Sequence, residues 1–292
     1  MMLSIILLSS FQTKYYSGFI VNIKNYNCNI PFLISKDCSN NFDTLNVNNG
    51  FLDEKILITY PTYIKVKYGS FSKMIYLAPD NSLKLSFDLK QIEETFKFEG
   101  IGANENYLLD TLYKIGKIDY SRIYNKSLSI TRSRYIDSSF NSLKDYFNNL
   151  AKVKSVNAEF IEYTNKLLDY EAAGYKIDNS YNDLLCNKLL NEVNLENEKY
   201  LSIPSFRNYI VVLLNCSANN LIAKSNGSES FYAFVDAELK ITESINQPRI
   251  KEFLVFNSVY YLLFNMGVKN FDKYYTYFNL HNTDTTYRKI QF

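Results

Sequence analysis

The chain has 292 residues and a mass of 34.1 kDa, which is enough for two domains of ordinary size. Apolar residues make up 47% and charged residues 21%, a composition typical of a folded protein rather than a disordered one. The net charge of +2 argues against a dedicated nucleic-acid-binding protein, which usually carries a large basic excess. One histidine and four scattered cysteines exclude the usual zinc-binding spacings.

Residues 1–12 start with an apolar run, Met1 to Leu8, and then become small and polar. This pattern is typical of a short secretory signal peptide, although the usual basic start is missing. A first buried strand is the alternative interpretation. We expect a signal peptide over residues 1–13 and an exported protein of the periplasm or cell envelope. No other segment reaches the roughly 18 uninterrupted apolar residues of a membrane span, so we expect no transmembrane segment.

The next part of the chain has the period-2 alternation of short strands. Ile, Val, Tyr and Phe are enriched in segments 18–23, 30–34, 43–47, 55–60, 62–68, 73–78 and 82–87. Turn-forming residues separate several of these segments, notably Asn48-Asn49-Gly50 and Pro79-Asp80-Asn81. The spacing predicts an antiparallel β-sandwich-like domain over residues 14–99.

Beyond residue 100 the apolar residues take helical spacing. We expect helices over residues 104–117, 132–150, 158–173, 181–196, 205–221, 229–245 and 249–264. Pro204 and Pro248 lie close to two helix starts, with Ser202 and Asn246 as candidate caps. The fold class predicted is therefore α+β, with an all-α helical domain over residues 100–292.

The glycines at the junction do not form a nucleotide-binding loop. Gly100 and Gly102 complete neither the phosphate-loop pattern nor the dinucleotide-binding pattern. A corner between a strand and a helix is the better interpretation, with Asn104 as a candidate helix cap.

Other residues with catalytic chemistry do not form a recognisable set. His281 is a candidate base, but no nucleophile motif accompanies it, so a surface or helix-end histidine is the favoured interpretation. Glu93 and Glu94, or Asp169 and Glu171, are carboxylate pairs, although adjacent acids are usually solvated. Arginines and tyrosines alternate between residues 120 and 135, which we interpret as a solvated helix face rather than a nucleic-acid site.

The four cysteines form no Cys-x-x-Cys pair. Cys28 and Cys38 lie in the strand-rich segment and can face each other across a hairpin, so they are a candidate structural disulfide in an oxidising compartment. Cys186 and Cys216 lie in apolar helical patterns, and we expect both to be buried free thiols.

Two phrases in the middle of the chain carry a family resemblance. The turn Leu77–Asn81 lies between two strands, and the phrase Phe98–Asn106 then leads into the helices. These phrases, with residues 205–209 and 250–254, resemble the amino-terminal region of TlpA-like thiol-disulfide reductases of Bacteroidetes, which often begin with a β-rich domain of the DUF4369 type. The expected glycine of the first turn is absent. The resemblance covers roughly residues 14–292.

The resemblance implies a β-rich leading domain and a helical region, but no catalytic residue. In that family the helices lead into a thioredoxin domain with a Trp-Cys-x-x-Cys site, and this chain has neither tryptophan nor Cys-x-x-Cys. We expect an exported, non-catalytic binding or accessory protein that recognises a protein partner or small ligand, without cofactor or metal. The alternative is a truncated or split thiol-disulfide oxidoreductase, and an unrelated hydrolase is a third hypothesis.

Overall fold

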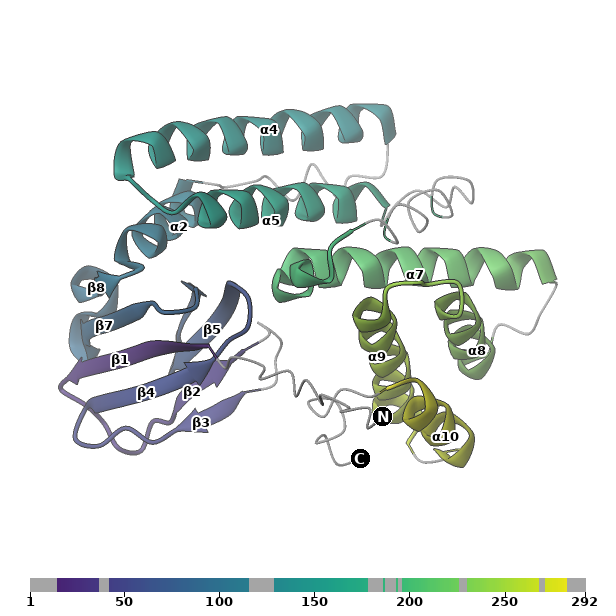
Figure 1. Cartoon of the computed structure of the whole chain (residues 1–292), viewed down its shortest axis with the longest axis horizontal. Coiled ribbons are helices and arrows are strands. Elements are labelled where there is room, and N and C mark those ends of the chain that lie inside the picture. The colour runs from purple at the N-terminus through teal and green to yellow at the C-terminus, as the bar shows by residue number, and fades with distance from the viewer. Residues whose placement is uncertain are drawn as a thin grey trace, which may run out of the picture. The chain divides into compact units, whose positions relative to one another are not determined.

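Figure 1 shows the computed structural model, which describes residues 15–36, 42–115, 129–177, 186, 193, 196–225, 230–267 and 271–282. Strands come first and helices follow, which confirms the α+β fold class. The chain divides into two compact units. The first unit contains the strands and the chain up to Tyr113, together with Lys154–Asn157, and the second contains the other helices. The expected signal peptide lies outside the described residues.

The described strands form two four-stranded sheets. Sheet A has the order β4-β1-β7-β8, with bounds β4 Phe51–Leu57, β1 Tyr16–Lys24, β7 Ser82–Asp88 and β8 Lys97–Ile101. Sheet B has the order β3-β2-β5-β6, with bounds β3 Asp43–Leu45, β2 Phe32–Ser35, β5 Thr62–Tyr68 and β6 Phe71–Leu77.

Strands β1 and β7 pair in parallel, whereas the other neighbours are antiparallel. The expectation of a purely antiparallel sandwich is therefore wrong at this one pair. Between β1 and β7 the chain crosses to sheet B and back twice, so no hairpin sets the direction of β7 relative to β1. Strand β8 was not predicted.

The core of the first unit lies between the two sheets. Buried positions alternate with half-buried ones along β1 and β7, as the two-residue period of a strand requires. Rings from opposite sheets meet there, with centroid distances of 6.5 Å between Phe19 and Phe32 and 6.0 Å between Tyr68 and Phe87. The buried Tyr68 keeps its hydroxyl satisfied, because it donates to the carbonyl of Asn27 at 3.0 Å.

Helix α2 (Ala103–Ile115) closes the edge of strand β6 with one side chain. The Oδ1 atom of Asn106 accepts a hydrogen bond from the N–H of Tyr76 at 2.8 Å. Its Nδ2 atom donates to the carbonyls of Tyr76 and Gly102, each at 2.9 Å. Because β6 is the last strand of sheet B, the amide occupies the place of a residue from a further strand. Asn106 is 1% exposed, so water cannot replace these hydrogen bonds.

The next residue of α2 covers the edge of β8 in the same way. The hydroxyl of Tyr107 accepts a hydrogen bond from the N–H of Phe98 at 3.2 Å, and the two rings meet edge to face. Gly100 allows β8 to approach β7, since its φ is +87° and a Cβ atom there would lie 2.1 Å from the carbonyl oxygen of Ser82. The first unit therefore runs past the expected 14–99 span, because α2 seals its sheet edges.

The described helices after β7 are mostly long. Their bounds are α1 Ile92–Thr95, α2 Ala103–Ile115, α4 Ser129–Lys154, α5 Ala158–Ile177, α7 Pro204–Ser225, α8 Phe231–Thr242, α9 Pro248–Met266 and α10 Phe271–His281, with 3-10 turns η1 Leu89–Gln91 and η2 Glu198–Ser202. Helix α10 was not predicted. The predicted helix 181–196 falls mostly outside the described residues.

The predicted helix starts are confirmed at the prolines, whereas the candidate caps Asn246 and Asn104 are wrong. Pro204 and Pro248 are the first residues of α7 and α9. The residue that caps α9 is Gln247 rather than Asn246, and its side chain makes no capping hydrogen bond. Asn104 lies inside α2 and therefore does not cap it.

In the second unit the helices from α5 onward pack in chain order. Helix α5 contacts α7, α7 contacts α8, α8 contacts α9, and α9 contacts α10 (Figure 1). The last three share a core of aliphatic and aromatic side chains: Val235, Leu239, Val255, Val259, Leu262, Tyr274 and Phe278. From α7 onward each connection has at most five residues, and short connections favour this neighbour-to-neighbour packing.

Candidate functional site

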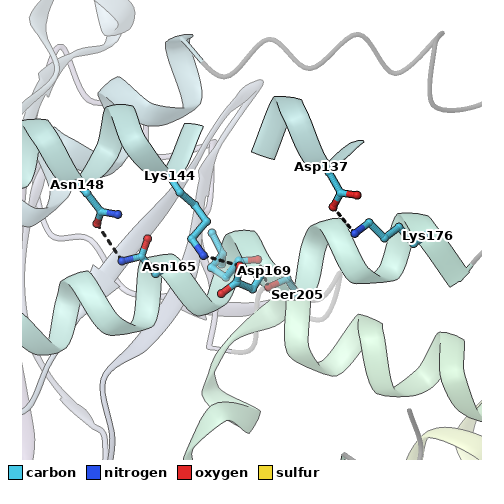
Figure 2. A network of polar contacts seen from close by, with 8 residues as sticks. Asp137, Lys144, Asn148, Asn165, Asp169, Lys176 and Ser205 are labelled. Carbon is cyan, nitrogen blue, oxygen red and sulfur yellow. Dashed lines mark hydrogen bonds and ion pairs between the residues drawn. The ribbon is translucent and has the colours of Figure 1, made fainter. Parts of the chain in front are cut away.

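A ladder of polar pairs joins α4 to α5 in the second unit (Figure 2). The three pairs are Asp137–Lys176, Lys144–Asp169 and Asn148–Asn165. Their members are seven and then four residues apart on each helix, in opposite chain directions, which is the register of an antiparallel helical hairpin. The charged side chains are between 27% and 51% exposed. Exposed pairs of this kind orient two helices and contribute little stability, so the ladder is structural.

The carboxylates that the sequence suggested as catalytic pairs do not act together. Asp169 is bound to Lys144 at 2.7 Å. Glu171 is two residues further along α5, and side chains two positions apart do not share a helix face. Burial raises the pKa of Glu171 to about 7. Glu93 and Glu94 are exposed on α1. Neither pair therefore forms the facing carboxylates of a glycosidase.

His281 is the last residue of α10, where its ring lies against Tyr277 with a centroid distance of 4.3 Å. This is the helix-end position that the sequence analysis favoured over a catalytic one. Of the alternating basic and aromatic residues, Arg132 and Arg134 belong to α4, and residues 120–128 lie outside the described part of the chain.

Two lysines and two acids surround the ring of Tyr200 in η2. The Nζ atom of Lys199 lies 2.9 Å from Oε1 of Glu162, and Tyr200 donates its hydroxyl to the same oxygen at 2.7 Å. These two hydrogen bonds, that of Tyr200 first, lower the pKa of Glu162. Lys166 lies 5.0 Å from the Tyr200 ring centroid and 3.6 Å from Glu196. The charges satisfy one another, so this cluster fixes η2 to α5.

The outer face of sheet A, which we call the A face, differs from these clusters because other side chains leave it uncovered. Every described outward position of its strands is exposed or half-buried. The strand register places Tyr16 opposite Leu57, and these side chains are 43% and 52% exposed. Phe51 and Ile101 lie at other margins of the same face, with exposures of 49% and 65%.

The middle of the A face mixes apolar and charged residues. The half-buried Ile20 of β1 lies in register with Asp53 of β4 and Lys84 of β7. Gly18 and Ser82 pair nearer the start of β7. An ion pair of 2.7 Å joins Lys84 of β7 to Glu99 of β8, and Lys84 lowers the pKa of Glu99. Exposed large apolar side chains that share one face are common in surfaces that bind other proteins.

The outer side of sheet B provides a contrast within the same unit. Tyr63 and Tyr76 lie opposite each other on that side, and they are 0% and 1% exposed. Their rings meet edge to face at a centroid distance of 5.5 Å. The uncovered A face is therefore the better candidate binding surface of the first unit. The sequence analysis missed it, because strand alternation identifies an outward face but not whether another element covers that face.

The cysteines pair differently from the prediction. Cys186 and Cys216 form a disulfide with a Cα–Cα distance of 6.3 Å. The expectation that these two are free thiols is therefore wrong, since apolar helical patterns indicate burial but not proximity across 30 positions. Cys28 is exposed. Cys38 lies outside the described residues, so the pairing of Cys28 with Cys38 stays a prediction.

The described residues contain no cluster of three or more histidine, cysteine, aspartate or glutamate side chains that could hold a metal ion. In the same part of the chain, no helix combines the length and hydropathy that crossing a bilayer requires. Comparisons with protein-family models, curated proteins and solved structures find no match to this chain. The resemblance to TlpA-like reductases therefore stays a prediction.

Proposed function

We propose that the chain is an exported, non-catalytic binding or accessory protein, similar to the leading region of TlpA-like reductases, and that it recognises a protein partner through the A face. The observation that carries the proposal is the presence of four exposed large apolar side chains on one uncovered sheet face. Large apolar side chains in water favour a surface that a partner covers.

The shape and the edge of sheet A favour a particular way of binding. Small-molecule sites are usually concave, whereas every described outward residue of sheet A is exposed or half-buried. The outer edge of β4 carries Asp53, Glu54 and Lys55, and charged residues oppose the addition of a further strand. We therefore infer that a folded protein surface docks on the A face, rather than a strand on its edge.

The disulfide supports the exported location in this proposal. Disulfides form and persist in oxidising compartments and are rare where thiols are kept reduced. Cys186 is fully buried and 30 positions from its partner. A redox catalyst needs an accessible thiolate with a resolving thiol close by, so these features support a structural bond over a split oxidoreductase.

Site-specific photocrosslinking in the native cell envelope tests the binding surface. A photoreactive residue is placed at Ser82, an exposed outward position of β7 on the A face, or at the matched control Asn141, which is exposed on α4. We expect a discrete crosslinked protein from position 82 and none from position 141. The double variant Tyr16→Ala/Leu57→Ala is expected to abolish the product at position 82.

Two outcomes would contradict the proposal. Crosslinked products of equal yield from both positions would show that the A face has no special affinity. The absence of any product from position 82, in exported and folded protein, would remove the A face as a binding surface. Recovery of the native protein with Cys186 and Cys216 reduced would contradict the exported location.

A further inference from the structure

A carboxyl group is buried where three helices of the second unit meet. Glu238 of α8 is 2% exposed. In the amide orientation that satisfies Asn215 of α7, the Nδ2 atom of Asn215 donates to Oε1 of Glu238 at 2.6 Å and to the carbonyl of Val211 at 3.1 Å. The Oε2 atom of Glu238 has no hydrogen-bond partner, nor has the adjacent hydroxyl of Ser258 in α9.

The helices packed against α8 bring no charge to this carboxyl. The side chains that α7 and α9 place beside it, Asn215 and Ser258, are both neutral. Burial raises the pKa of Glu238 to about 7, Ser258 opposes this rise, and no charged neighbour contributes. Glu252 of α9 is also a buried acid, but it is six positions before Ser258, which is about 9 Å along the helix.

Asp236 of α8 is paired with α10, and Lys240, the other charged residue of α8, is exposed. Asp236 of α8 forms an ion pair of 2.6 Å with Lys273 of α10. Tyr277 of α10 donates its hydroxyl to the carbonyl of Leu239 at 3.2 Å, and burial raises the pKa of that hydroxyl. Among the described residues, no cation contributes to the pKa of Glu238.

We propose that Glu238 is a pH-dependent latch that holds α8 against α7 and α9 while its carboxyl is protonated and releases α8 when the carboxyl ionises. The protonated carboxyl of Glu238 needs few hydrogen bonds, and its surroundings supply few. A carboxylate in the same place has only neutral donors beside it, the Asn215 amide and the Ser258 hydroxyl, and no counter-ion, so its burial costs far more. Outward movement of α8 would admit water to the ionised group.

The direction of the pH effect follows from linkage. The native pKa of about 7 exceeds the ordinary value of 4.5, so native protein holds this proton more tightly than unfolded protein does. The stabilisation is complete below about pH 4.5 and is lost as the pH rises to about 7. Over that window the opening equilibrium constant rises by up to about tenfold per pH unit.

The test compares wild-type protein with Glu238→Gln, which keeps the shape and the neutral charge of the protonated acid. Hydrogen exchange of the α8 amides, corrected for intrinsic exchange rates, is measured from pH 5 to pH 8. We expect the ratio of wild-type to variant opening constants to rise at least tenfold over this range. Asp145→Asn, which removes an exposed carboxylate from α4, is the matched control, and its ratio is expected to stay within about twofold.

A ratio for Glu238→Gln that stays within about twofold across the range would overturn the latch. An equal change in the amides of every helix of the unit would also overturn it, because the effect would then be global rather than a release of α8. If Glu238→Gln fails to fold, isotope-edited infrared spectra of wild-type protein test the same claim. The band of the protonated Glu238 carboxyl must be present at pH 6 and absent at pH 8, and an ionised group at pH 6 would refute the proposal.

Discussion

The side chain of Asn106 provides the sharpest test of how the first unit is held together. Asn106→Ala removes three buried hydrogen bonds, two to the backbone of Tyr76 and one to the carbonyl of Gly102. Each such bond contributes about 1 kcal/mol net, and a buried group left without a partner costs about 1–3 kcal/mol. We therefore expect the free energy of unfolding to fall by about 3 kcal/mol, a large part of the stability of a domain.

Asn104→Ala is the matched control, since it makes the same substitution two residues earlier in α2. Asn104 is exposed and makes one long hydrogen bond, 3.4 Å, to the carbonyl of Lys154. Its loss is expected to cost less than about 0.5 kcal/mol. Urea unfolding is followed by circular dichroism and tyrosine fluorescence, because the chain has no tryptophan.

Hydrogen exchange at the amide of Tyr76 separates the first unit from the second, since the two units need not unfold together. The reasoning is refuted if Asn106→Ala and Asn104→Ala destabilise the protein equally within about 0.5 kcal/mol. It is also refuted if the Tyr76 amide stays fully protected in Asn106→Ala, because that amide would then have another partner.

Two further comparisons test the second unit and the charges of the first. Reduction of the Cys186–Cys216 bond, which spans 30 positions, is expected to cost about 3.6 kcal/mol from the loop-closure entropy of the unfolded chain, and calorimetry of oxidised and reduced protein measures it. Lys73→Met is expected to cost about 1–2 kcal/mol, because the Lys73–Asp110 ion pair is only 15% and 17% exposed. Lys84→Met breaks a pair of the same 2.7 Å length that is 38% and 50% exposed, so chemical denaturation is expected to show a loss below about 0.5 kcal/mol. Equal losses for the two lysines would contradict the role of burial.

Local patterns were sufficient to predict a strand or a helix where the apolar residues of the segment repeat with the period of that element. The alternation in residues 62–68 predicted β5, and helical spacing predicted most of α5 and α9. Strand β8 was missed because Lys97–Ile101 is short, contains a glycine and follows a helical turn rather than another strand. Helix α10 was missed because its aromatic residues are common to both kinds of element.

The candidate site depended on neighbours that local patterns do not identify. An asparagine within a helix is usually a surface residue. Asn106 instead caps the edge of sheet B, because α2 lies beside the backbone of Tyr76 in β6. The A face likewise depends on which sheet face stays uncovered. Glu238 is one of 30 acidic residues in the chain, and nothing in its immediate sequence separates it from those in solvent.

The amino-acid sequence by itself determined the α+β class, the order of strands before helices, and the corner at Gly100–Gly102, because each depends on periodicity and turn chemistry within a few residues. Only the tertiary structure decided the parallel pairing of β1 with β7, the bond between Cys186 and Cys216, and the burial of Glu238. These features join residues that are far apart in the chain. Their energies come from packing and desolvation, which depend on every element that surrounds the group rather than on its own segment.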